Sequence, residues 1–488
     1  MNKNITKLKP TALWGYFDEI LKIPRPSKQE EKIAAYVIEF AKKHKLSYKQ
    51  DAIGNVLITK PATPGMENRK TVCLQSHLDM VCEKNKDKKF DFEKDAIQAY
   101  IDGDWVTADG TTLGADDGIG VATQLAILSS GEIAHGPLEC LFTVDEETGL
   151  SGAFGLAPGF LKSEILLNLD SEDDGQIFIG CAGGRDTIAR FHFTKELIPD
   201  WNIPFKIVVG GLKGGHSGDD INKGLGNANK ILVRILYLAM KKYGIRLHNF
   251  NGGNLRNAIA REAEAIVLIN QTIKEKFVRL VDDFNATVKK ELKTTEPDLI
   301  VKTFQVDPPY FVIDQTSQRN LINALYACPH GVIQMSREIP NFVETSTNLA
   351  SVKTLDDGFL ITTSQRSSVS SALDDVVNMV ESTFRLINAD VEHSDGYPGW
   401  TPNPDSEILK ISEQAYKKLF NENPKVLAVH AGLECGLIGE KYPGMDMISI
   451  GPDIKGAHSP DERILIQSVE RFWDWTLEIL KQIPEKKI

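Results

Sequence analysis

Several short apolar segments of the sequence end in histidine or carboxylate residues that could bind a metal ion. His77 and Asp79 close the segment TVCLQSHLD. In a His-x-Asp pair at the end of a strand, the imidazole can bind a metal while the carboxylate fixes the ring. A single pair of this kind is more often structural than functional. The pair therefore becomes a candidate for a metal site only if other segments supply further ligands.

Asp116 lies in TLGADDGIG, where flanking glycines let the backbone approach a site closely. A carboxylate at this position could bridge two metal ions. Alternatively, Asp116 could cap the helix that follows, although the neighbouring Asp117 can also perform that role. The sequence leaves both interpretations of Asp116 open.

Two adjacent glutamates, Glu146 and Glu147, follow the apolar run in LECLFTVDEE. Neighbouring carboxylates point in different directions, so one can bind a metal while the other transfers protons. The alternative for an isolated acidic run of this kind is a solvated loop. A metal site is the better interpretation of the two glutamates only if other segments of the chain supply further ligands.

Asp170 closes ILLNLD, and His458 follows the strand-like run of MISIGPDIKGAH. Asp461 and Glu462, in the same segment as His458, are expected to start the next helix. An accidental display of ligand types at every one of these positions is a poor explanation. Oxygen and imidazole ligands without thiolate suit catalytic zinc, manganese or cobalt rather than a cysteine-bound structural zinc.

The segments that carry these residues have the length and composition of buried strands. They are too short for typical helices and fit the sheet of an α/β domain. Ligand sites in such sheets gather at the carboxyl ends of the strands. Near the N-terminus, Ser27 and Glu30 have the spacing of a capping box at the start of a helix. The strand-end residues thus predict one site assembled from distant parts of the chain.

The pattern changes between about residues 185 and 395, where strand-like runs alternate with long amphipathic helices. Those helices are expected near 225–243, 273–292 and 371–388. The Gly- and Pro-rich stretch HSDGYPGWTPNPDS resembles a connection back to the first domain. We therefore predict a discontinuous α/β domain with a second, α+β domain inserted. The predicted limits are 1–186 and 396–488 for the first domain and 187–395 for the insertion.

The length of 488 residues is too great for one compact core and predicts about two or three domains. The formal net charge of −11 argues against a nucleic-acid or anionic-membrane partner. No apolar stretch is long enough for a signal peptide or a membrane span. The six cysteines are scattered without CxxC spacing, which is typical of reduced thiols. We therefore expect a cytoplasmic protein.

The motifs HLDM, LGADDGIG, TVDEETG, NLDSE, GGHSG, HAGLECG and GAHSPDE occur in the order found in one known family. The sequence resembles the aminoacyl-histidine dipeptidases (peptidase D, or cytosol non-specific dipeptidases), within the aminoacylase and carboxypeptidase group of di-zinc metallopeptidases. The resemblance implies a catalytic α/β domain with a central mixed sheet and an inserted α+β lid domain. It also implies two zinc ions per chain, for which cobalt or manganese could substitute. The implied substrates are unblocked dipeptides of broad specificity, including β-alanyl-histidine.

Metal-binding roles also follow from the resemblance. His77 and Asp170 would hold one zinc ion, and Glu147 and His458 would hold the other. Asp116 would bridge the two ions together with a water or hydroxide.

Catalytic roles are implied for the two remaining residues of this set. Asp79 would orient His77, and Glu146 would be the general base for attack by the bridging hydroxide. Two successive glutamates are then needed because the base must stay free of the metal.

The resemblance implies three substrate contacts from the lid domain. His216, in GGHSG, would reach the developing oxyanion. Arg366, in TTSQRSS, would clamp the free carboxylate of the substrate, a task that suits a bidentate guanidinium. Asn257, in NLRNAIARE, would lie near the substrate. The alternatives are a loop histidine, a surface arginine and an asparagine that merely begins a strand.

His430 and Glu434 have the i, i+4 spacing of a helical pair and could rival the proposed ligands. The resemblance instead implies that this glycine-bearing segment lies beside the substrate at the start of a helix. We therefore keep His430 out of the predicted metal site.

Two other functions remain open. An N-acyl amino acid deacylase or tripeptidase of the same group would keep the fold and change the substrate. A metal-bearing binding protein without catalysis is the second alternative, although Asp79 and Glu146 argue against it. Small dipeptides are the expected partners, without nucleic acid or membrane. A homodimer is one option for the oligomeric state, which the sequence leaves open.

Overall fold

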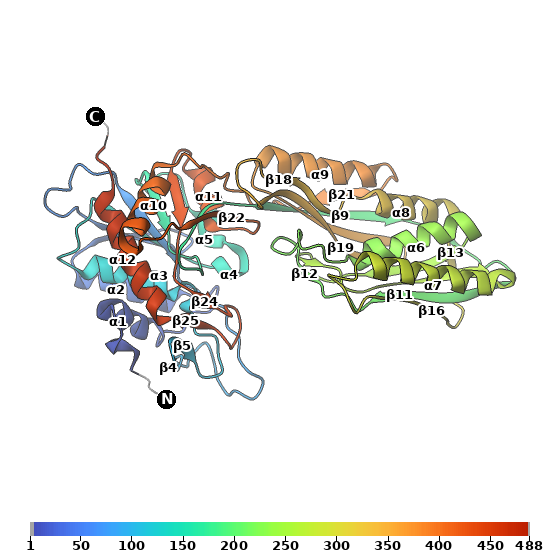
Figure 1. The fold of residues 1–488 in the computed structure, drawn as a ribbon, viewed down its shortest axis with the longest axis horizontal. Coiled ribbons are helices and arrows are strands. Elements are labelled where there is room, and N and C mark those ends of the chain that lie inside the picture. Colours follow the sequence, from blue (N-terminus) through green and yellow to red (C-terminus); the bar gives the residue numbers. More distant parts are fainter. Residues whose placement is uncertain (1–3, 487–488) are drawn as a thin grey trace. The chain divides into compact units, whose positions relative to one another are not determined.

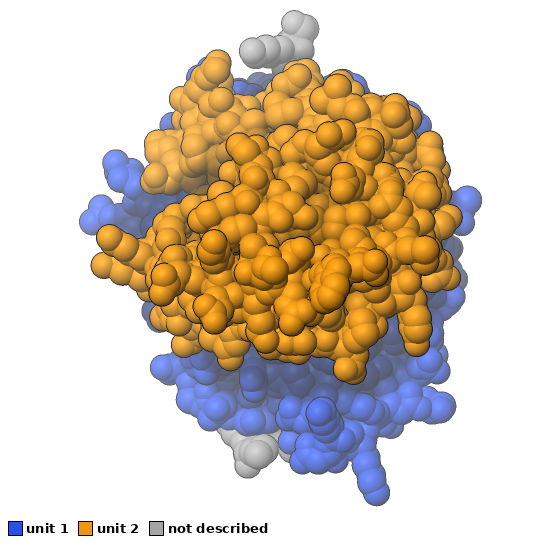
Figure 2. Space-filling model, turned by 90° about the vertical axis from the view of Figure 1, so that its right-hand side faces the viewer, with its two compact units in different colours: residues 1–180, 400–428, 433–488 blue, residues 181–399, 429–432 orange. Residues whose placement is uncertain are grey.

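The computed structural model describes residues 4–486, and the chain forms two compact units. Unit 1 comprises Met1–Gly180, Trp400–Ala428 and Leu433–Ile488, and unit 2 comprises Cys181–Gly399 and Val429–Gly432 (Figures 1 and 2). Unit 1 is thus discontinuous in sequence. Among the described residues, no helix is both long and apolar enough to cross a membrane.

Unit 1 is built around an eight-stranded sheet. In spatial order its strands are β1 (Ser47–Gln50), β2 (Val56–Lys60), β6 (Leu138–Thr143), β3 (Val72–His77), β7 (Ile165–Asn168), β23 (Asp446–Ser449), β8 (Gln176–Cys181) and β22 (Lys425–Val429). The neighbours β6, β3, β7 and β23 are parallel, whereas β1 pairs antiparallel with β2, β2 with β6, and β8 with β23. The predicted central mixed sheet is therefore confirmed.

The three strands β6, β3 and β7 are buried along their whole length, which explains their nearly continuous apolar sequences. The helices of unit 1 include α1 (Thr11–Ile20), α2 (Glu31–Lys43), α3 (Ala115–Ser129), α10 (Glu407–Phe420), α11 (Glu434–Lys441) and α12 (Ile466–Gln482). Helix α3 packs against α1 and β3, and α10 packs against α12 and β23. The parallel strands therefore end at one edge of a sheet that helices hold in place.

A small four-stranded sheet joins distant parts of unit 1. Its order is β24 (Ile454–Lys455), β25 (Arg463–Leu465), β5 (Trp105–Ala108) and β4 (Ala99–Asp102). The loop between β24 and β25 carries His458. Pairing of β25 with β5 fixes this loop relative to the chain that leads into α3.

Unit 2 contains a nine-stranded sheet in which all the pairs are antiparallel. The order is β16 (Ile300–Gln305), β11 (Asn202–Gly210), β15 (Ala263–Asn270), β13 (Arg246–Gly252), β19 (Val343–Thr354), β20 (Gly358–Ser367), β9 (Gly183–His192) and β21 (Asp390–His393), with β18 (Gly331–Met335) also paired to β19. Two short strands, β12 (Gly215–His216) and β14 (Ala258–Ile259), form a separate pair.

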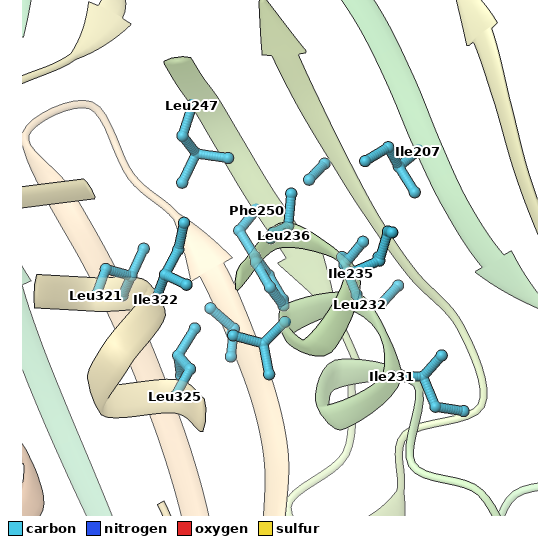
Figure 3. Close-up of a cluster of buried hydrophobic side chains, with 14 of the residues drawn as sticks. Ile207, Ile231, Leu232, Ile235, Leu236, Leu247, Phe250, Leu321, Ile322 and Leu325 are labelled. Carbon is cyan, nitrogen blue, oxygen red and sulfur yellow. The ribbon is translucent and has the colours of Figure 1, made fainter. Parts of the chain in front are cut away.

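The helices of unit 2 are α6 (Ala228–Tyr243), α7 (Lys274–Glu291), α8 (Gln315–Ala327) and α9 (Ser370–Arg385). Three of them match the predicted helices, whereas α8 was not foreseen. Apolar side chains of α6 pack against those of α8 and of β13 (Figure 3). The residues labelled there are Ile207, Ile231, Leu232, Ile235, Leu236, Leu247, Phe250, Leu321, Ile322 and Leu325. This buried cluster gives unit 2 a core of its own.

Candidate active site

His77 is the last residue of β3, and its side chain is 1% exposed. Its Nε2 atom lies 3.1 Å from Asp116 Oδ1 and 3.4 Å from Asp170 Oδ1. Asp170 follows β7, the parallel neighbour of β3, so both side chains emerge at the same edge of the sheet. Asp116 reaches them from the irregular first turn of α3.

The second oxygen of Asp116 faces a different imidazole. His458 Nε2 lies 3.2 Å from Asp116 Oδ2 and 3.0 Å from Glu147 Oε2. Asp116 therefore stands between the two histidines, with one carboxylate oxygen directed at each. Asp117, the alternative helix cap, accepts a hydrogen bond of 3.1 Å from the backbone of Gly120.

All the residues predicted as metal ligands are therefore brought together in unit 1. Two groups of side chains each offer ligand atoms within 4.8 Å of one another. The groups are His77, Asp116 and Asp170, and Asp116, Glu147 and His458. A further group combines Glu146 with His77 and Glu147. The first two groups share Asp116, which is the arrangement that a bridging carboxylate requires.

The residues present fit metal ions at these positions. Glu147 Oε1 is buried without a hydrogen-bond partner, although its other oxygen faces His458. A buried carboxylate oxygen without a partner is costly in the protein alone. Each of the two groups sharing Asp116 supplies one imidazole and two carboxylate ligands, a set of three protein ligands that suits catalytic zinc.

Several carboxylates crowd the site and perturb one another's ionisation. Burial raises the pKa of Asp170 to about 7, against the opposing effect of His77. Burial also raises the pKa of Glu146 well above its usual value, and the nearby Asp170 and Glu147 add to this effect. The hydrogen bonds that His458 can donate to Asp116 and Glu147 raise its pKa to about 11. Bound cations would relieve this accumulation of negative charge.

Asp79 connects His77 to the pair of glutamates. Its Oδ1 lies 3.2 Å from His77 Nδ1 and accepts a hydrogen bond of 3.0 Å from the backbone N–H of Glu146. Its Oδ2 accepts hydrogen bonds from Ser27 Oγ at 2.7 Å and from the backbone N–H of Glu147 at 3.2 Å. Although burial opposes ionisation, His77, with help from Ser27 and the backbone N–H of Glu146, lowers the pKa of Asp79 to about 2. An ionised Asp79 can fix the ring of His77.

The predicted capping box at Ser27 and Glu30 is wrong. Helix α2 begins at Glu31, and its N-cap residue, Glu30, makes no capping hydrogen bond through its side chain. Ser27 instead donates its hydroxyl to Asp79. A local spacing rule cannot foresee a partner that is distant in sequence.

The prediction that Asp461 and Glu462 start a helix is also wrong, because α12 begins at Ile466. The side chain of Glu462 turns inward and accepts hydrogen bonds from backbone N–H groups of the loop that leads to Asp116. Arg25, which the sequence analysis did not identify, donates a hydrogen bond to the carbonyl of Gly114 in the same loop.

Arg366, His216 and their partners lie together in unit 2. Arg366 is 7% exposed, and its Nη1 donates a hydrogen bond of 2.8 Å to Tyr397 Oη. Its Nη2 lies 3.4 Å from His216 Nε2, and its Nε is buried without a partner. The Nδ1 atom of His216 lies 3.0 Å from Asp219 Oδ2. The guanidinium therefore retains one buried N–H group that could donate a hydrogen bond to a bound anion.

Tyr397 is a residue that sequence reasoning missed, because it lies in the stretch expected to be only a connection. A Cβ atom at Gly184 would lie 2.7 Å from Tyr397 Oη, and one at Gly432 would lie 2.8 Å from its Cε2. The tyrosine ring thus occupies space that two glycines leave free. The YPGW motif was the available signal, but it gives no indication of the contact with Arg366.

Asn257 precedes β14, and its carbonyl accepts a hydrogen bond of 2.8 Å from the N–H of Ser217. His216 and Asn257 both line a pocket of about 1050 Å³ in unit 2. The structure therefore brings Asn257 close to the His216 strand.

His430 and Glu434 do not form the helical pair that their spacing predicted. His430 follows β22, and its Nε2 lies 2.7 Å from Ser346 Oγ in unit 2. Glu434 begins α11 in unit 1 and accepts hydrogen bonds from Gln75 Nε2 at 2.6 Å and Thr143 Oγ1 at 2.8 Å. Burial raises the pKa of Glu434 to about 7. Among the residues described, neither belongs to a group that could hold a metal.

Comparisons with known proteins agree with the family resemblance that the motifs indicate. The model of peptidase family M20/M25/M40 matches residues 73–482. The chain is 46% identical over 482 residues to the cytosol non-specific dipeptidase of Escherichia coli (strain K12), covering 99% of each chain.

Solved structures give the same result. The aminoacylhistidine dipeptidase from Vibrio alginolyticus superimposes with a TM-score of 0.94 at 46% identity, with 99% of each chain covered. The aminopeptidase PepT from Bacillus cereus, at 16% identity and a TM-score of 0.58 over 98% of this chain and 99% of its own, shares the fold. The family resemblance deduced from the motifs is thereby confirmed: this chain belongs to peptidase family M20/M25/M40, whose members are metal-dependent hydrolases.

Proposed function

We propose that this chain is a dipeptidase that binds two zinc ions and hydrolyses unblocked dipeptides of broad specificity, including aminoacyl-histidine dipeptides. The observation that carries the proposal is the position of Asp116, whose two oxygens lie 3.1 Å from His77 Nε2 and 3.2 Å from His458 Nε2. The names of the relatives from Escherichia coli and Vibrio alginolyticus support the choice of substrate.

One zinc ion would be held by His77 and Asp170, and the other by Glu147 and His458, with Asp116 shared. Zinc bound there would polarise the scissile carbonyl and lower the pKa of an attacking water toward neutrality. Asp79 keeps the ring of His77 in the orientation that directs Nε2 toward the site.

Glu146 is the proposed general base. Its carboxylate accepts a proton from the attacking water and then donates it to the nitrogen of the leaving amino acid as the C–N bond breaks. Glu147, the next residue, is then the ligand rather than the base.

We further propose that unit 2 acts as the lid domain and binds the substrate. His216 would donate a hydrogen bond to the developing oxyanion, and Asn257 would lie beside the substrate. Arg366 would pair with the free carboxylate through the guanidinium donors that protein groups do not use, which is supported by its unpartnered Nε. Because Arg366 would bind the carboxylate of the residue that directly follows the scissile bond, a dipeptide should be a better substrate than a longer peptide.

The test is a hydrolysis assay on the zinc-loaded full chain. Free dipeptides, N-acetylated amino acids and tripeptides are compared by kcat/KM. Preference for free dipeptides supports the proposal. Preference for N-acetylated amino acids or tripeptides would instead indicate a deacylase or a tripeptidase, and zinc binding without turnover would indicate a binding protein. A cytoplasmic location is also proposed, since the Escherichia coli relative is named a cytosol enzyme.

A further inference from the structure

We propose that Glu462 and Arg25 are positioning residues that hold the loop before Asp116 in the conformation needed to bind both metal ions. This inference rests on the proposed metal centre. It assigns a function to two buried charged side chains that are not themselves ligands, each 2% exposed.

Glu462 binds four successive backbone N–H groups of one loop. Its Oε2 accepts from Leu113 at 2.7 Å and from Gly114 at 2.9 Å. Its Oε1 accepts from Ala115 at 2.7 Å and from Asp116 at 3.3 Å. A buried carboxylate that accepts hydrogen bonds from four successive backbone N–H groups fixes the direction of those groups.

The same contacts connect the two sides of the proposed metal centre. Glu462 lies in the loop between β24 and β25, a few residues after His458. The carbonyl of Glu462 accepts a hydrogen bond of 2.8 Å from Thr107 Oγ1, which fixes its backbone. Through Glu462, the segment carrying His458 is therefore fastened to the segment carrying Asp116.

Arg25 holds the opposite side of the loop. Its Nη2 donates to the carbonyl of Gly114 at 2.5 Å, and its Nη1 donates to the carbonyls of Leu78 at 2.9 Å and Asp79 at 2.6 Å. One planar guanidinium thus connects the turn after His77 to the turn before Asp116. The residues that join His77, Asp116 and His458 are then Arg25 and Glu462.

Gly114 shows how closely the loop and Arg25 fit. Its φ of +72° is a left-handed conformation that favours glycine. A Cβ atom there would lie 2.6 Å from Arg25 Nη2. Position 114 therefore suits glycine for two reasons: glycine tolerates the positive φ, and it has no Cβ atom to collide with the guanidinium of Arg25.

The chain offers a matched control for a purely structural role. Glu139 is also a buried carboxylate of unit 1, and it accepts backbone N–H groups of Lys162 at 2.8 Å and Ser163 at 3.0 Å. It lies early in β6, whereas Glu146 and Glu147 follow the end of that strand. Loss of its charge should affect folding stability without affecting the metal centre.

The experiment measures the zinc dissociation constants of the full chain by competition with a chelator. The variants are Glu462→Gln, Arg25→Lys and Glu139→Gln, and the thermal midpoint of each metal-free protein is recorded. Glutamine at position 462 would direct the N–H donors of its amide at backbone N–H groups, which are themselves donors. Lysine at position 25 cannot reach all three carbonyls that Arg25 binds. Both variants should bind zinc at least about tenfold more weakly, whereas Glu139→Gln should match the wild type.

Zinc binding that is unchanged in folded Glu462→Gln and Arg25→Lys would overturn the inference. An equal loss of zinc affinity in Glu139→Gln would also overturn it, because the effect would then be general destabilisation. If Glu462→Gln does not fold, Arg25→Lys decides. Failure of the wild type to bind zinc would refute the proposed metal centre instead, so the two failures are distinguishable.

Discussion

Asp116 is the residue on which the proposed metal centre depends, because its carboxylate oxygens are divided between His77 and His458. The residue types and their positions after strands allowed this site to be predicted from the sequence. The assignment of each ligand to one ion came from the family resemblance. The groups of neighbouring side chains are compatible with that assignment, which stays a prediction.

One substitution can distinguish the proposed roles of Glu146 as general base and Glu147 as metal ligand. Glu146→Gln should retain metal and fold but lose roughly 10²–10⁴ in kcat, because a positioned general base contributes about that much. Zinc content and kcat on a free dipeptide are measured together. If the variant cleaves dipeptides at a near-normal rate with its zinc retained, Glu146 is not the base.

Arg366 should determine the preference for a free carboxylate. Charge-assisted hydrogen bonds contribute roughly 1.5–3 kcal/mol each, so Arg366→Ala should strongly reduce kcat/KM for dipeptide acids. Arg366→Lys should retain only part of the wild-type kcat/KM, because an ammonium group lacks the planar, bidentate geometry of a guanidinium. The measurement is kcat/KM for a dipeptide and its C-terminal amide. The wild type should discriminate strongly between them and the alanine variant far less.

Tyr397 provides an intermediate case for the same measurement. Tyr397→Phe keeps the ring between Gly184 and Gly432 but removes the hydroxyl that accepts from Arg366 Nη1. Its discrimination between acid and amide should fall between those of the wild type and Arg366→Ala. Tyr243→Phe, which removes a hydroxyl directed at the carbonyl of Lys276, is the control. A wild type that treats acid and amide alike would rule out the carboxylate clamp.

At the level of elements, apolar runs identified the strands whose ends carry the candidate ligands. The sequence of β3 reveals its burial, and parallel pairing of β6, β3, β7 and β23 brings their ends to one edge. The contacts of Ser27 and Glu462 could not be predicted, since each partner is distant in sequence. The helical spacing of His430 and Glu434 did not predict their structure for a different reason, because the chain turns between β22 and α11 and separates the two residues.

The turn into α3 allows an element-scale prediction. Gly114→Ala should lower the midpoint of thermal unfolding of the metal-free protein by more than Gly103→Ala does. Both glycines have positive φ values, +72° and +59°, at which a non-glycine residue costs about 1–2 kcal/mol. Only at position 114 would the new Cβ atom also meet Arg25. Equal midpoints for the two variants would show that the loop yields easily and that its fit to Arg25 is not tight.

For the whole molecule, changes in composition and periodicity indicated an inserted unit, and unit 1 is indeed built from separated stretches of chain. All the proposed metal ligands lie in unit 1, whereas Arg366, His216 and Asn257 lie in unit 2. The return of residues 429–432 to unit 2 was not foreseen. Such a short excursion has no compositional signature, because it depends on contacts such as that between His430 and Ser346.

The most direct test of the proposed bridged metal centre is the number of zinc ions bound per fully active chain. Metal-free protein is titrated with zinc while bound metal is measured by elemental analysis and dipeptide hydrolysis is followed in parallel. The proposed site predicts about two zinc ions per chain at full activity and reduced occupancy of both positions in Asp116→Ala. Full activity with no metal, or with a single ion per chain, would contradict it.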